Sequence, residues 1–150
     1  MGTHKTVFGE TTVKELIERI HLLQAGDPAQ WGKMNAGQML RHCTLSEEMF
    51  LGKKQYKRLF IGKLFGRMAL NGILKNEDPL KKSQPTHPDL KITATGDFEA
   101  ERVKWIGLLK AYSTFSNPDF VHPFFGKMTK DEIGKYVYKH TDHHLRQFGK

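Results

Sequence analysis

The chain has 150 residues, of which 38% are hydrophobic and 27% charged, a composition typical of one folded domain rather than a disordered chain. Its formal net charge is +8, and its one cysteine, Cys43, excludes an intrachain disulfide. No run of about 18 apolar residues occurs, so we expect neither a membrane span nor a membrane partner. The N-terminal residues lack the apolar core of a signal peptide. We therefore expect a single domain over residues 1–150 in a reducing compartment such as the cytoplasm.

The first two predicted helices carry recognisable start signals. Residues 12–23 form the first, with Thr12 as N-cap and Glu15 three residues later, as in a capping box. Residues 35–51 form the second, with Asn35 as N-cap. Apolar residues recur at helical spacing in both and predict the buried faces: Val13, Leu16, Ile17, Ile20 and Leu23 in the first, and Ala36, Met39, Leu40, Cys43 and Phe50 in the second.

A third helix is predicted over residues 57–74, where Phe, Leu, Ile and Met are frequent. Gly62, Gly66 and Gly72 either interrupt it or allow another element to approach closely. The densest run of basic residues, 53–67, overlaps its first half and also contains Tyr56 and Phe60. We interpret this run as a solvated helix face whose apolar residues turn inward, in preference to a nucleic-acid site.

The second half of the chain begins with a long connection, because Pro79, Pro85 and Pro88 exclude regular helix from residues 75–95. Residues 91–95 are an isolated candidate strand. The fourth helix, 98–115, has Val103, Ile106, Leu108 and Leu109 as its apolar residues, and Asn117-Pro118 follows it.

An aromatic loop, His122-Pro-Phe-Phe-Gly126, precedes the fifth helix, which begins with a second capping box at Thr129 and Glu132 and runs to about Phe148. The fold class is therefore all-α. The helix lengths and the long connection predict a four-helix bundle with a crossover and a short extra helical segment.

Two histidines on the last helix form the most informative pattern. His140 and His144 are four residues apart, so they share a face with Ile133 and Val137. Two buried imidazoles each need a partner for the acceptor nitrogen, and one cation between them serves both. His143 falls at the edge of this face, and we interpret it as a supporting or surface residue. The alternative is that all three are ordinary hydrogen-bonded histidines.

A third ligand is expected from another inward helical face, and His42 on the second helix is the best candidate. His4, His21 and His87 are weaker candidates, because they lie in predicted loops or outside the apolar stripe. Three neutral imidazoles with open coordination positions suit zinc or nickel, and iron or copper less well.

The segments Trp31–His42 and His140–Gln147 resemble the two signature regions of the DinB-like (YfiT-type) superfamily. The similarity extends along essentially the whole chain and is strongest to a branch with a His-Pro-Phe-Phe-Gly loop, known only as a domain of unknown function. The resemblance implies a four-helix bundle with a long crossover and often a homodimer. It also implies a zinc or nickel site at His42, His140 and His144. Some relatives are thiol-dependent transferases or isomerases.

We therefore expect a metal-dependent enzyme acting on a small molecule, either a hydrolase or a thiol-dependent transferase. A proton donor or site-wall residue is proposed at His122, with a packing role as the equal alternative. Asp142, Glu47 and Glu48 could orient ligands, but we favour solvated surface carboxylates. Cys43 is interpreted as a buried structural thiol. The competing hypotheses are a non-catalytic metal-binding or small-molecule-binding module and a nucleic-acid binder driven by the net charge.

Overall fold

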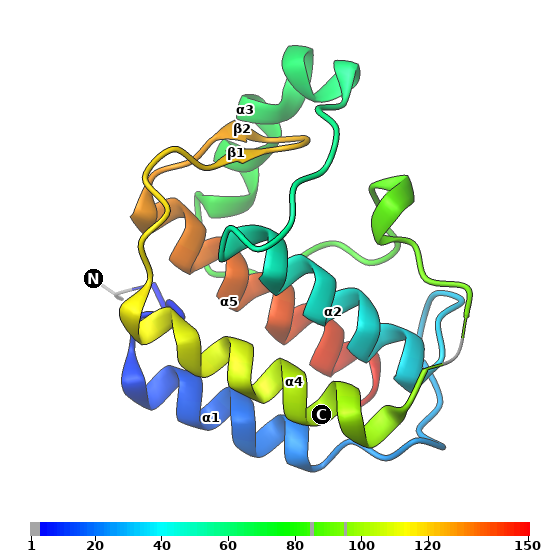
Figure 1. Cartoon of the computed structure of the whole chain (residues 1–150). Helices are drawn as coiled ribbons and strands as arrows, with labels where there is room; N and C mark the ends of the chain where they lie inside the picture. Colours follow the sequence, from blue (N-terminus) through cyan, green and yellow to red (C-terminus); the bar gives the residue numbers. More distant parts are fainter. Residues whose placement is uncertain (1–3, 85, 95) are drawn as a thin grey trace.

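A computed structural model describes residues 4–84, 86–94 and 96–150. Within these residues the chain forms five α-helices and one small antiparallel sheet (Figure 1). In chain order the elements are α1 (Glu10–His21), α2 (Ala36–Phe50), α3 (Phe60–Leu74), η1 (Pro88–Leu90), α4 (Phe98–Ala111), η2 (Tyr112–Thr114), β1 (Val121–His122), β2 (Gly126–Lys127) and α5 (Lys130–Gln147).

Four helices enclose the core. α4 contacts both α1 and α2, and α5 contacts the same two helices from the other side. Figure 1 shows α1 and α4 along one side of the molecule and α2 beside α5. The space between them is filled by large buried side chains, which include Leu16, Ile20, Leu40, Phe50, Trp105, Leu109, Ile133 and Leu145. None of the helices in the described part of the chain has the length and hydrophobicity to cross a lipid bilayer.

The two helices that carry the histidine pattern begin where the sequence predicts. The Asn35 side chain accepts from the Gln38 amide at the start of α2, and the Thr129 side chain accepts from the Glu132 amide at the start of α5; both form complete capping boxes. The prediction for α1 is wrong in this respect. The helix begins at Glu10, before Thr12, because the Gly9 carbonyl already accepts from the Val13 amide.

The aromatic loop of the sequence is a β-hairpin, in which β1 pairs with β2, and α3 packs against it. The helix presents Gly62 and Gly66 to the Phe124 backbone, at a distance that leaves no room for a Cβ atom. The Arg58 guanidinium, just before the helix, donates to the Phe124 carbonyl at 2.7 Å. The glycines therefore determine which face of α3 is covered by protein.

The large apolar side chains between Phe60 and Met68 consequently point outward, and the expectation that Phe60 turns inward is wrong, whereas Leu70 near the end of α3 is fully buried. Phe60 is 74% exposed and Met68 67% exposed. A helix whose glycine face is in contact with a neighbouring backbone must present its opposite face to its surroundings.

The remaining differences concern the connection and α4. Residues 91–94 contain no strand, and Pro85 and Thr95 lie outside the described residues. α4 ends at Ala111 and continues as the 3₁₀ turn η2. Val103, one of the apolar residues named from the sequence, is 68% exposed, whereas Trp105 is fully buried. The large indole, which the apolar pattern left out, faces the core instead.

Candidate metal centre

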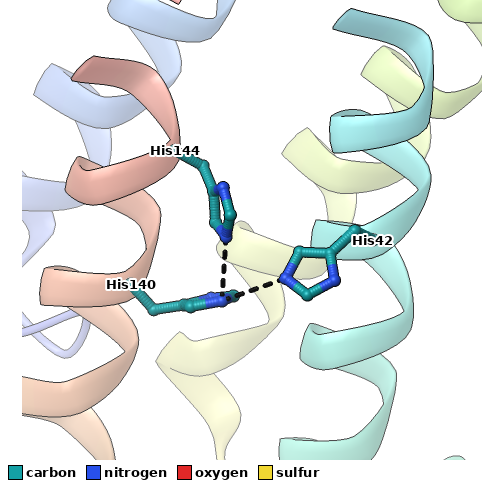
Figure 2. A group of neighbouring side chains, drawn as sticks. All are labelled: His42, His140 and His144. Carbon is teal, nitrogen blue, oxygen red and sulfur yellow. Dashed lines mark hydrogen bonds between the residues drawn. The ribbon is translucent and has the colours of Figure 1, made fainter. Parts of the chain in front are cut away.

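Three histidines from two helices converge on one point (Figure 2). His42 projects from the middle of α2, and His140 and His144 lie one turn apart on α5. The Nε2 atom of His140 is 3.2 Å from Nε2 of His42 and 3.1 Å from Nε2 of His144. The structure thus brings together the same three residues that the helical faces of the sequence select.

The ring orientation of His42 is fixed by the backbone. Its Nδ1 atom lies 2.8 Å from the carbonyl oxygen of Leu90 in η1. A carbonyl oxygen only accepts, so Nδ1 carries the hydrogen and donates it. The Nε2 atom of the neutral ring is then an acceptor, and its lone pair points toward His140.

His144 is oriented by a relay that reaches the loop before α2. The Gln147 amide nitrogen lies 2.9 Å from the Trp31 carbonyl oxygen, to which it can only donate. The Gln147 carbonyl oxygen therefore faces His144 Nδ1, 2.8 Å away, and accepts its hydrogen. As for His42, this leaves Nε2 of His144 as an acceptor directed into the cluster.

Burial keeps all three rings neutral. It lowers the pKa of His42 below the ordinary value, a shift that the Leu90 carbonyl only partly opposes. It lowers the pKa of His140 and His144 well below the ordinary value, and the neighbouring histidines of the cluster add to the shift. Metal ligation requires neutral imidazole, so protons compete little at this site near neutral pH.

The donor set fits a transition-metal ion. If Nε2 of His140 carries its hydrogen, it donates to only one of the two lone pairs that face it, so the other has no hydrogen within the triad. With the hydrogen on Nδ1 instead, all three Nε2 atoms present lone pairs. A shared cation satisfies all three lone pairs at once. With zinc–nitrogen bonds of about 2.1 Å, neighbouring ligand nitrogens lie roughly 3.0–3.4 Å apart. The two separations that involve His140 fall in this range, and all three ligand atoms lie within 4.8 Å of one another.

His143 lies beside the triad and not in it. Its ring centre is 5.1 Å from that of His144 and 5.3 Å from that of Trp31, and the side chain is buried. On the other side, the Tyr136 ring stacks on His140 at 5.8 Å. The sequence left His143 as a supporting or surface residue, and its burial beside His144 fits the supporting role.

The three carboxylates are not solvated, and that interpretation of the sequence is wrong. Asp142 is 5% exposed and pairs with Arg19 of α1 at 2.9 Å and Arg146 at 2.8 Å. Glu48 is 7% exposed and pairs with Lys104 of α4 at 2.8 Å.

Glu47 is 1% exposed, and burial raises its pKa well above the ordinary value. Asp142 and Glu48 are thus held by ion pairs, whereas Glu47 is a buried carboxyl group whose ionised form is disfavoured.

His122 is part of the hairpin. Its Nδ1 atom accepts from the Phe124 and Phe125 amides at 3.0 and 3.1 Å, so Nε2 carries the hydrogen of the neutral ring. Burial and the nearby Arg58 lower its pKa to about 3. Its ring centre is 6.1 Å from that of Tyr136, which in turn stacks on His140. A catalytic role for His122 stays a prediction.

The other candidate side chains lie where the sequence suggested. Cys43 is buried with its Sγ atom 3.7 Å from the Met39 Sδ atom, as expected of a structural thiol. His21 is exposed on α1, and His87 contacts the Lys57 carbonyl oxygen at 3.1 Å. The sequence did not reveal the Leu90 carbonyl, because a main-chain acceptor leaves no mark on residue identity.

The fold and the site together define a helical protein with a buried cluster of three histidines. The chain belongs to DUF1569, a family of proteins of unknown function whose model matches residues 7–150. That range includes all five α-helices and the whole histidine cluster. Neither the curated proteins nor the solved structures contain a significant match to the chain.

Proposed function

We propose that His42, His140 and His144 hold one divalent transition metal, zinc or nickel, and that the protein is a metal-dependent enzyme. The observation that carries the proposal is the pair of hydrogen bonds made by the Nδ1 atoms of His42 and His144, on the side of each ring away from the cluster. Leu90 and Gln147 each hold a ring by Nδ1, so that both Nε2 lone pairs face His140. Such orientation of ligands by a second layer of groups is typical of metal sites.

A divalent ion held by three neutral imidazoles lowers the pKa of a water or thiol bound at its remaining positions and polarises carbonyl groups. The reaction class that follows is hydrolysis or thiol transfer on a small molecule. The roles of the chain's own residues are positional. Gln147 and Leu90 orient the rings, and Tyr136, Trp31 and His143 surround them.

The same proposal includes a DinB-like four-helix bundle with a long crossover. It is supported by the order in which the helices surround the core, α1, α4, α2 and α5. Between α2 and α4 the chain passes through α3 and a connection of more than twenty residues. This arrangement is the one expected when the middle two helices of a bundle are not joined by a short loop.

A non-catalytic metal-binding module is the second candidate. The observation that favours it is that the candidate bases named from the sequence are engaged elsewhere. Both Asp142 oxygens pair with arginines, and His122 uses its lone pair for two backbone amides. A general base must have a basic atom within reach of the reacting group.

Elemental analysis of the purified protein tests metal binding. We expect about one equivalent of zinc or nickel in the wild type under metal-replete conditions and loss of that metal in His42→Ala and in His140→Ala/His144→Ala. His21→Ala is the matched control, because His21 is exposed on α1. The absence of bound metal in the folded wild type, or its retention in the double variant, would refute the proposal.

Turnover then distinguishes the two candidates. Simple esters, and a low-molecular-weight thiol with an electrophile, are the substrates to assay before and after metal removal. Activity that is lost with the metal and restored by its return supports the enzyme. A fully loaded protein that turns over neither substrate class supports the module.

A further inference from the structure

The outward side of α3 carries a row of large apolar side chains, here called the α3 face: Phe60, Ile61, Leu64, Phe65 and Met68. Their exposures run from 48% at Phe65 to 74% at Phe60. Five side chains of this size at these exposures present roughly 500 Å² of apolar surface, at the upper end of what a monomer usually leaves uncovered.

The orientation of α3 is fixed by contacts along its length. Near its start, Gly62 and Gly66 leave no room for a Cβ atom against Phe124. At its end, the Lys139 ammonium of α5 donates to the carbonyls of Ile73 at 2.6 Å and Asn76 at 2.9 Å. The helix therefore cannot turn its apolar side inward without bringing larger side chains against the hairpin backbone.

The segment that contains the α3 face carries charge of one sign. Residues 49–76 contain no Asp or Glu, but they contain Lys53, Lys54, Lys57, Arg58, Lys63, Arg67 and Lys75. Arg58 donates to the hairpin carbonyls, and Arg67 pairs with Glu132 at 2.5 Å. The side chains of Lys53, Lys57 and Lys63 are exposed. An anionic partner is the one that these charges complement.

We propose that the α3 face docks on an anionic lipid bilayer surface, although the sequence alone led us to expect no membrane partner. A helix with apolar and aromatic residues on one side and basic residues beside them lies in the headgroup region, where apolar burial and attraction to anionic lipid act together. Figure 1 shows α3 and the hairpin at one end of the molecule, away from α1 and α4, with the start of α3 at the extremity. A flat surface can therefore reach it.

Other occupants fit the charges or the apolar area less well. A second copy packed across a two-fold axis at α3 would place this basic patch against the same basic patch of the other copy, because an isologous interface uses one patch on both subunits. A nucleic acid would complement the lysines, but it would leave the aliphatic side chains of Ile61, Leu64 and Met68 without an apolar partner. A lipid surface complements both the basic charge and the apolar area of the α3 face. The proposal does not depend on the proposed metal chemistry.

Vesicle flotation tests the proposal with the whole protein. We expect the wild type to float with vesicles of equal parts phosphatidylcholine and phosphatidylglycerol, and much less with phosphatidylcholine alone. Phe60→Ser/Leu64→Ser should weaken partition by roughly tenfold or more, since two inserted apolar side chains are lost. Val103→Ser is the matched control, because Val103 is 68% exposed on α4, compared with 63% for Leu64.

Charge reversal provides the second arm. Lys57→Glu/Lys63→Glu should abolish flotation at low salt, whereas Lys14→Glu/Lys110→Glu, on exposed positions of α1 and α4, should leave it nearly unchanged. Equal losses in both pairs would mean that net charge alone drives binding, and would overturn the proposal. The absence of flotation would also overturn the proposal. If, in addition, light scattering shows a dimer that Phe60→Ser/Leu64→Ser dissociates, the α3 face is occupied by a second copy of the chain.

Discussion

His144 Nδ1 lies 2.8 Å from the Gln147 carbonyl oxygen, less than one turn further along α5. This bond decides which nitrogen of His144 faces the other two histidines, and the Trp31 carbonyl decides which end of the Gln147 amide is presented. Gln147, which is not a proposed ligand, thus determines the tautomer of His144, which is one.

The first prediction follows from that bond. Gln147→Leu keeps the approximate volume but removes the acceptor, so His144 loses its orientation and the apparent metal affinity should fall by about 10–100-fold. Competition with a chromogenic chelator measures the change. Gln24→Leu, in the exposed turn after α1, is the control and should leave the affinity unchanged. Equal affinities in the two variants would show that the relay does not act on the metal.

The second prediction concerns His122 and pH. Its folded-state pKa is about 3, below the ordinary value, so the unfolded chain binds more protons at intermediate pH. The free energy of unfolding should therefore fall as pH drops below about 6.5 and level off near 3, by up to about 1.4 kcal/mol per pH unit from this residue. His122→Asn preserves an acceptor for the two amides but cannot titrate, so its stability should depend less on pH.

His122→Ala completes that comparison. It leaves the Phe124 and Phe125 amides without their acceptor, and we expect it to cost about 2–4 kcal/mol at neutral pH. Denaturant unfolding at several pH values gives both results. Identical pH slopes in wild type and His122→Asn would show that His122 does not stay neutral in the folded protein.

The third prediction tests the glycine contact of α3. Gly62→Ala and Gly66→Ala each place a Cβ atom against the Phe124 backbone and should lower stability by about 1–3 kcal/mol. Gly72→Ala, in the same helix, meets nothing within 4 Å and should raise stability by about 0.5–1 kcal/mol. Thermal unfolding distinguishes the two cases. Stabilisation by all three substitutions would contradict the close approach of α3 to the hairpin.

The fourth prediction separates stability from metal binding. Asp142→Asn leaves the largely buried Arg19 guanidinium without its anion and should cost about 1–3 kcal/mol, while the metal content stays unchanged. Asp131→Asn removes an exposed carboxylate paired with Lys135 on the same helix and should cost less than about 1 kcal/mol. Loss of metal in Asp142→Asn would assign that carboxylate to the site.

The parts of the fold that depend on local chemistry could be predicted from the sequence. Asn35 and Thr129 cap their helices through residues three positions away, and His140 and His144 share a face by helix geometry alone. What failed depends on distant partners. The buried Asp142 pairs with Arg19, which lies 123 positions earlier. The outward face of α3 is determined by the contact of its glycines with the Phe124 backbone. A local sequence pattern cannot reveal partners that come together only when distant helices pack.

The Leu90 carbonyl has a consequence for how this chain can vary. Since the main chain supplies the acceptor for His42, exchanging the Leu90 side chain for another apolar one leaves that oxygen in position. A deletion in the connection between α3 and α4 would displace it. We infer that the connection between α3 and α4 is constrained more tightly in length than in residue identity. Homologues that have lost the site should therefore show alignment gaps in this connection rather than substitutions.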